Sequence, residues 1–135
     1  MTINRKLITK GFIAAGLMNM SVFVFSRFIT NHVITETDPD VMSNFGLLMI
    51  VIWGLAYLSV AHSFQNVKWL IGVFAVEKLF YGINWTFWIL ENSVLTIFEK
   101  DVMAGMFYSI YGINDWLFSI FFFGVFIRLR KEKYN

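Results

Sequence analysis

The sequence predicts an all-α integral membrane protein, a four-helix bundle in up-down-up-down order that forms a single transmembrane domain over residues 1–135. Composition is the first observation: hydrophobic residues make up 58% of the chain and charged residues 15%, against roughly 45–50% and 25% in soluble domains. A soluble domain of this length could not cover so many apolar side chains with so little polar surface. A bilayer makes covering them unnecessary.

Hydropathy and short connections are the second and third observations. A helix needs about 20 apolar residues to cross ~30 Å of hydrocarbon, and four segments qualify: residues 10–29, 45–61, 69–90 and 102–127. The first follows a basic N-terminus, as in a signal peptide, but its end, FSRFITNHV, has no A-x-A-like cleavage site, so we expect an uncleaved helix. The short connections make successive helices antiparallel neighbours.

Lysine and arginine are divided unequally between the two ends of the predicted bundle. One end holds most of them: Arg5, Lys6, Lys10, Lys68, Arg128, Arg130, Lys131 and Lys133. The other end holds Arg27 and Lys100. Because basic residues gather on the cytoplasmic side of membrane proteins, both termini are predicted in the cytoplasm, at a bacterial cytoplasmic (inner) membrane.

Polar residues interrupt the third and fourth apolar segments. The stretch YGIN occurs at residues 81–84 and again at 111–114. Counted at 1.5 Å per residue from the outer ends of their helices, the two copies are expected to differ in depth by ~9 Å. Such an offset breaks the inverted symmetry of a transporter repeat, and the recurrence is interpreted as chance.

The same count places four ionisable or amide side chains on one level near the middle of the bilayer. They are Glu77, Lys78, Asn114 and Asp115, with Asn19 of the first segment close to that level. At 100° per residue, one helix stripe joins Glu77, Tyr81, Asn84 and Trp88, and another joins Tyr108, Tyr111, Asp115, Ser119 and Phe122. The candidate residues for binding or proton exchange are Glu77, Lys78, Asp115, Asn114, Asn84, Tyr81, Tyr111 and Asn19.

Burial in hydrocarbon constrains how these charges are arranged. A lone charge at mid-bilayer costs about 2.5–3.5 kcal/mol on insertion scales, so the third and fourth helices are expected to pack stripe to stripe, with Lys78 neutralised by Asp115 or Glu77. One base and two acids leave one acid in excess. We expect that acid to be protonated, because a low-dielectric surrounding disfavours the charged form.

Two interpretations of the cluster follow from this arrangement. It is either a structural clasp between helices or a site on a proton or substrate path. The leading functional hypothesis is a non-enzymatic binding or accessory subunit. The alternatives are a small proton-coupled transporter or carrier, and a membrane enzyme acting on a lipid or quinone with Asp115 or Glu77 as general acid or base.

Several other classes of function are disfavoured by what the sequence lacks. With no cysteine there is no disulfide, thiolate nucleophile or zinc ribbon. The two histidines, His32 and His62, fall on opposite sides of the predicted membrane, and no histidine box or phosphate loop occurs. No metal or cofactor is therefore predicted. No nucleic acid is predicted either, because the net charge of +2 is too small to suggest nucleic-acid binding. The expected partners are the lipid bilayer, a second copy or another membrane protein, and a small-molecule or lipid ligand.

In length and hydropathy, four short-linked spans in a chain of this size resemble many small bacterial membrane proteins, including the DoxX-like group. The resemblance covers length and hydropathy only. It carries over no site residue and no function.

Overall fold

The computed structural model describes residues 4–132, and these form helices and turns without a strand. The helices are α1 (Arg5–Met20), α2 (Val22–Phe25), α3 (His32–Thr37), α4 (Asn44–Val60), the 3-10 helix η1 (Phe64–Asn66), α5 (Lys68–Glu91), α6 (Val94–Lys100) and α7 (Val102–Glu132). The all-α prediction is therefore confirmed. Lys133, counted among the basic residues above, lies outside the described residues.

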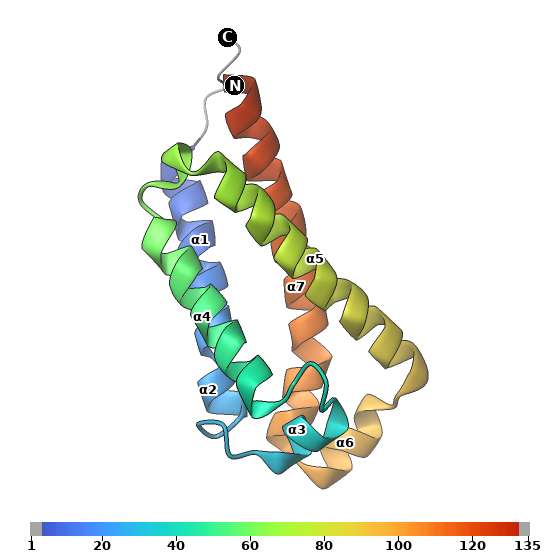
Figure 1. Cartoon of the computed structure of the whole chain (residues 1–135). Coiled ribbons are helices and arrows are strands. Elements are labelled where there is room, and N and C mark those ends of the chain that lie inside the picture. Colours follow the sequence, from blue (N-terminus) through green and yellow to red (C-terminus); the bar gives the residue numbers. More distant parts are fainter. Residues whose placement is uncertain (1–3, 133–135) are drawn as a thin grey trace.

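The four long helices form two pairs, α1 with α4 and α5 with α7. The chain runs along α1, returns along α4, runs down α5 and returns along α7 (Figure 1). We call the end where α1 begins and α7 ends the terminal end, and the opposite end, which holds α3 and α6, the loop end (Figure 1). Two helical stretches, Arg5–Phe25 and Val102–Glu132, are long and apolar enough to cross a membrane, and α4 is a shorter apolar helix.

Helix boundaries agree with the predicted segments for α4 and α5 and differ elsewhere. The first segment was expected to reach residue 29, but its helix ends at Phe25, because Arg27, Phe28 and Ile29 have φ values of 49°, 55° and 66°. The left-handed conformation cannot continue a right-handed helix. The predicted connections 30–44 and 91–101 contain the short helices α3 and α6, and α7 extends five residues beyond the predicted end at residue 127 to Glu132.

Asp101 holds the left-handed turn against the start of α7. Its carboxylate accepts hydrogen bonds from Arg27 Nη2 at 2.7 Å, Asn31 Nδ2 at 3.0 Å and the backbone N–H of Ala104 at 2.8 Å. The last of these caps the N-terminus of α7, where backbone N–H groups lack helical partners. The left-handed conformation of Arg27, Phe28 and Ile29 costs roughly 1–2 kcal/mol per residue. The hydrogen bonds from Arg27 and Asn31 to Asp101 hold this segment at its two ends.

Aromatic side chains from all four long helices fill the core near the terminal end. Phe12 of α1, Tyr57 of α4, Phe74 of α5 and Phe122 of α7 are fully buried. Their ring centroids lie 4.8 Å apart for Tyr57–Phe74, 5.0 Å for Tyr57–Phe122 and 5.2 Å for Phe12–Phe122. Because such pairs add about 0.5–1.5 kcal/mol each beyond area burial, this layer joins the two helix pairs.

The two YGIN copies lie opposite each other where α5 packs on α7. Gly82 faces the Trp116 ring, which a Cβ would approach to 3.1 Å, and Gly112 faces the Trp85 ring so closely that a Cβ would overlap it. Each glycine thus faces the tryptophan that follows the other copy, so the two copies overlap along the helix pair and their asparagines, Asn84 and Asn114, lie closer in level than the predicted ~9 Å. The count failed because α6 carries the chain further toward the loop end before α7 begins (Figure 1).

The Gly–Trp contacts predict opposite effects for two glycines of the same helix. Gly112→Ala should lower the free energy of unfolding by roughly 1–3 kcal/mol, because the new Cβ overlaps the root of the Trp85 ring. Gly124→Ala is the matched control: a Cβ at this position would have nothing within 4 Å, so we expect no loss and up to about 1 kcal/mol of gain. Equal melting temperatures for the two variants would contradict the proposed packing.

Asp101 predicts a pH effect with a definite sign. Desolvation acts to raise the pKa of this carboxyl, but the hydrogen bonds from Ala104, Asn31 and Arg27 together hold the pKa below its ordinary value of 3.8. Its contribution to stability is therefore complete above pH 3.8 and is lost as the pH falls through the lower folded-state pKa.

Two substitutions at Asp101 separate the cap from the charge. Asp101→Ala should lose roughly 1–2 kcal/mol at neutral pH, mostly from the missing cap. Asp101→Asn should keep most of that stability and lose the acid-dependent part, measured by thermal unfolding between about pH 2.5 and pH 7. A wild-type and an Asp101→Asn profile of the same shape would argue against the assigned role.

Candidate functional site

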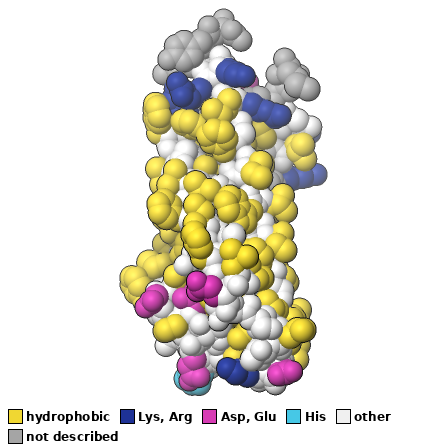
Figure 2. Space-filling view, turned by 90° about the vertical axis from the view of Figure 1, so that its right-hand side faces the viewer, with side chains coloured by type: hydrophobic (Ala, Val, Ile, Leu, Met, Phe, Trp, Pro, Cys, Tyr) yellow, Lys and Arg dark blue, Asp and Glu magenta, His cyan; other side chains and the backbone are white. Residues whose placement is uncertain are grey.

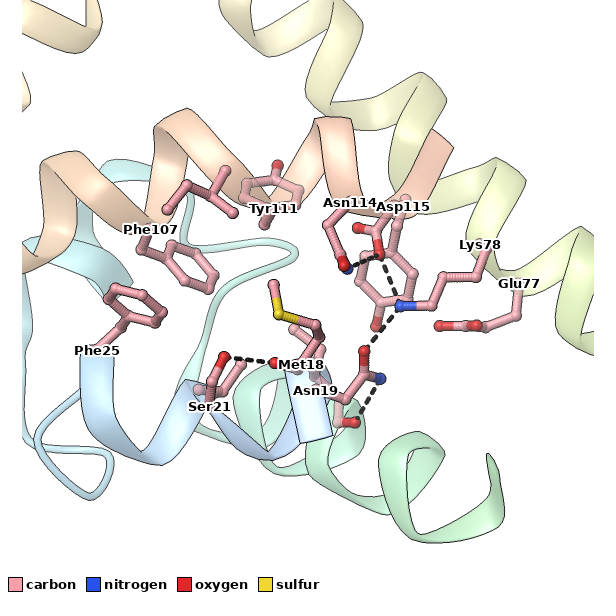
Figure 3. A pocket seen from close by; sticks show the side chains of 14 residues that line it. Met18, Asn19, Ser21, Phe25, Glu77, Lys78, Phe107, Tyr111, Asn114 and Asp115 are labelled. Atoms are coloured by element: carbon pink, nitrogen blue, oxygen red, sulfur yellow. Dashed lines mark hydrogen bonds and ion pairs between the residues drawn. The ribbon is translucent and has the colours of Figure 1, made fainter. Parts of the chain in front are cut away.

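A continuous chain of hydrogen bonds crosses the centre of the molecule and touches all four long helices. Lys78 Nζ of α5 lies 2.7 Å from Asp115 Oδ1 of α7 and 2.8 Å from Asn19 Oδ1 of α1. Asn19 Nδ2 in turn donates to the carbonyl oxygen of Ile50 in α4 at 2.9 Å. Lys78, Asn19 and Asp115 are 1%, 3% and 5% exposed. Figure 3 shows the three side chains converging from their separate helices.

Local sequence explains how each member reaches the centre. Lys78 lies on the buried face of α5, in register with Ile71, Phe74 and Gly82. Asp115 lies on the buried face of α7 with the other members of its predicted stripe, Tyr108, Tyr111, Ser119 and Phe122, which are all buried. That stripe is confirmed.

Asn19 reaches α4 because two glycines bring the backbones together. A Cβ on Gly16 would come within 3.0 Å of the Gly54 carbonyl oxygen, and a Cβ on Gly54 would come within 2.8 Å of the Asn19 Cβ. Small residues permit such close approach between apolar helices. The Asn19 amide therefore spans directly from the Ile50 carbonyl to the lysine.

Glu77 belongs to a second branch of the cluster. It accepts a hydrogen bond from the hydroxyl of Tyr57, which is fully buried in α4, while the Tyr57 ring lies 5.4 Å from Lys78 Nζ. Of the two predicted partners of Lys78, Asp115 makes the ion pair; Glu77, which is half-buried, does not, because it lies about 100° further round α5 and faces α4.

Tyr57 is not among the residues that the sequence predicts for this cluster. It is one of only two hydroxyl-bearing residues in α4, the other being the exposed Ser59, and it shares the helical spacing of the buried Ile50 and Gly54. A lone tyrosine on the buried face of an otherwise apolar helix was the available signal.

A cavity of about 40 Å³ lies beside this cluster, between α1–α2 and the α5–α7 pair. Its polar lining consists of Asn19, Ser21, Glu77, Lys78, Tyr81, Tyr111, Asn114 and Asp115, and apolar side chains such as Met18 and Phe107 complete it (Figure 3). Because one water needs roughly 10–15 Å³ of such space and two or more polar partners, the cavity has room for two or three waters. It does not have room for an organic substrate.

The remaining predicted candidates fall at different distances from the centre. Asn114 Nδ2 lies 3.4 Å from Asp115 Oδ1, so it adjoins the ion pair. Tyr81 and Tyr111 line the cavity, and the buried Tyr111 hydroxyl has no hydrogen-bond partner among residues 4–132. Asn84 stands apart, because its amide donates to Asp38 after α3 at 3.3 Å.

Charge balance decides which chemistry the arrangement permits. Lys78 and Asp115 neutralise each other, and the surplus carboxyl is Glu77, which lines the cavity. Within residues 4–132, no group of three His, Cys, Asp or Glu side chains is placed to hold a metal ion. The cluster can therefore hold its helices together, and Glu77 can exchange a proton with water in the cavity.

Comparison with known proteins adds no relative: no family model, no curated protein sequence and no solved structure matches the chain. The likeness in length and hydropathy to the DoxX-like group therefore assigns the chain to no family.

The ion pair predicts a pattern of loss and recovery. Lys78→Met should cost roughly 3–5 kcal/mol of unfolding free energy, because it leaves Asp115 buried without its counter-charge. Lys78→Met combined with Asp115→Leu should recover most of that loss, because a buried pair replaced as a unit by apolar residues is often neutral.

Lys100→Met supplies the control for removing a positive charge. Lys100 is exposed at the loop end, so its replacement should change stability by no more than about 0.5 kcal/mol. The assignment fails if the double variant is as unstable as Lys78→Met alone, or if Lys78→Met is as stable as Lys100→Met.

Proposed function

We propose that the chain is a small integral membrane protein, a non-enzymatic binding or accessory subunit whose polar cluster clasps its helices together. The first support is the exposed surface. Large apolar side chains such as Phe80 and Phe87 of α5 and Leu117 and Ile120 of α7 are 63–70% exposed. Apolar area of this extent marks contact with a membrane or a partner.

The distribution of charge supports the same proposal. On the face that lies to the right in Figure 1, Lys and Arg side chains gather at the terminal end, hydrophobic side chains form a belt, and Asp and Glu side chains lie mostly toward the loop end (Figure 2). A belt of this kind between two polar ends suits a bilayer. In the proposed topology α1–α2, α4, α5 and α7 cross the membrane, with the terminal end in the cytoplasm of a bacterial cell.

The observation that carries the clasp is the chain of contacts from Ile50 through Asn19 and Lys78 to Asp115. Each acceptor and donor in it has a partner on a different long helix. In hydrocarbon, where no water competes for these groups, such contacts favour one arrangement of helices over others. The outward-facing apolar surface is then left for lipid or for a partner membrane protein.

The absence of cysteine makes the topology directly testable. We expect Asn66→Cys at the terminal end to react with a membrane-impermeant maleimide only from the cytoplasmic side. Glu99→Cys at the loop end should react only from the opposite side. Leu117→Cys, in the apolar belt, should react only after solubilisation. Labelling of Leu117→Cys in intact membranes, or of both end positions from one side, would refute the four spans.

A second candidate function is a small proton-coupled carrier, and the surplus carboxyl beside a water-sized cavity is the observation that favours it. Intramembrane acids near water often belong to proton paths. In this case Glu77 would gain and lose a proton while Lys78 and Asp115 stay paired.

Proton flux into vesicles distinguishes the two candidates. For the accessory subunit, reconstituted protein should move no protons above the empty-vesicle rate when a potential is applied, whether or not it carries Glu77→Gln. For the carrier, the wild type should acidify the vesicle interior, as a trapped pH-sensitive dye would report. Glu77→Gln should abolish this acidification. Glu99→Gln, an exposed control at the loop end, should not. Flux in the wild type would replace the first proposal by the second.

A further inference from the structure

A long apolar groove runs along the outer side of the α5–α7 pair, away from the polar cluster. Its volume is about 690 Å³, within the roughly 300–1,000 Å³ typical of small-molecule sites. Gly72, Ala75 and Ser119 form part of its lining, and because these residues are small they leave the groove open. Val76 and Phe123 also line it. Such a shape suits a flexible hydrocarbon chain.

Two aromatic residues lie at the terminal end of the groove, and a cationic side chain lies over each of their rings. Trp69 and Phe126 lie with ring centroids 5.6 Å apart. Lys68 Nζ lies 5.5 Å from the Trp69 ring, and the Arg130 guanidinium lies 5.9 Å from the Phe126 ring. The apolar groove therefore ends at two positive charges that are held over adjacent rings.

A second depression continues from this point across the terminal end. Its volume is about 710 Å³, and Trp69 lines it as well as the groove. Arg5 and Lys68 contribute positive charge to its lining, and Glu132 contributes the one negative charge. With Arg130 close by, the cations outnumber the acid. An anionic group is therefore favoured at this junction.

We propose that an anionic phospholipid binds here, with one acyl chain in the groove between α5 and α7 and its phosphate between Lys68 and Arg130. The occupant follows from charge complementarity: an apolar tail fits the groove, and a negative headgroup fits its basic mouth at the same end of the molecule. The site rests on the proposed membrane location and identifies a ligand for the binding role.

Native mass spectrometry of the detergent-purified protein tests the proposal with phosphatidylglycerol and phosphatidylcholine of identical acyl chains. We expect phosphatidylglycerol to be retained preferentially. Lys68→Ala and Arg130→Ala should each weaken its binding roughly fivefold. Lys10→Ala removes an exposed charge from the same end without touching the groove, and should leave binding unchanged.

A variant that fills the groove tests the acyl-chain part of the site. Val76→Trp places a large ring in the groove, and because Val76 is 51% exposed the fold should tolerate it. Binding of phosphatidylglycerol should fall although Lys68 and Arg130 are intact. The thermal unfolding midpoint of each variant, measured without lipid, shows that the fold is retained.

Three results would overturn the site. Equal retention of the two lipids would mean a generic apolar surface, and an equal loss in Lys10→Ala would mean unspecific attraction to charge. If Val76→Trp abolished a dimer without changing lipid binding, the groove would be an interface between copies. Cysteine labelling separates this failure from that of the membrane proposal: insertion without lipid preference rejects the site alone, and no insertion rejects both.

Discussion

A lysine in an apolar interior must find its counter-charge within the fold, and this constraint organises the rest of the molecule. Lys78 is 1% exposed, and its ammonium contacts Asp115 and Asn19. Desolvating an ammonium and a carboxylate costs several kcal/mol per ion, which only good geometry with further hydrogen bonds offsets. Asn19, whose amide is anchored on Ile50, supplies one of those bonds and ties α1 and α4 to the ion pair.

Packing on either side of the ion pair keeps its atoms in place. Toward the terminal end, the aromatic layer of Phe12, Tyr57, Phe74 and Phe122 brings one ring from each long helix. Toward the loop end, the glycines of the two YGIN copies receive tryptophan rings from the facing helix. Tyr57 belongs to both the aromatic layer and the polar cluster, because its ring packs on Phe74 while its hydroxyl binds Glu77. The cluster and the core are therefore one structure.

The all-α class, the bounds of α4 and α5 and the neutralisation of Lys78 by one of two acids, Asp115 or Glu77, were predictable from the sequence, because apolar length and the penalty for an unpaired buried charge are local and strong. Which acid makes the ion pair was not predictable, because it depends on how α4, α5 and α7 pack. The level of the two YGIN copies was not predictable, because it depends on where α6 delivers the chain to α7. Tyr57 was overlooked for a similar reason: a hydroxyl becomes part of a site only when another helix brings Glu77 to it. The end of the first helix at Phe25 depends on Asp101, which lies 76 residues further along the chain.

The most direct test is a nitrogen–carbon distance measurement by solid-state NMR on the protein in lipid bilayers, with ¹⁵N in lysine side chains and ¹³C in aspartate carboxyls. Lys78–Asp115 is the one Lys–Asp ion pair among residues 4–132, so a single strong dipolar coupling should appear and should vanish in Asp115→Asn labelled in the same way. The account predicts this coupling, with the lysine nitrogen shielded from lipid protons. Its absence, together with contact between the Lys78 ammonium and lipid or bulk water, would contradict the central claim.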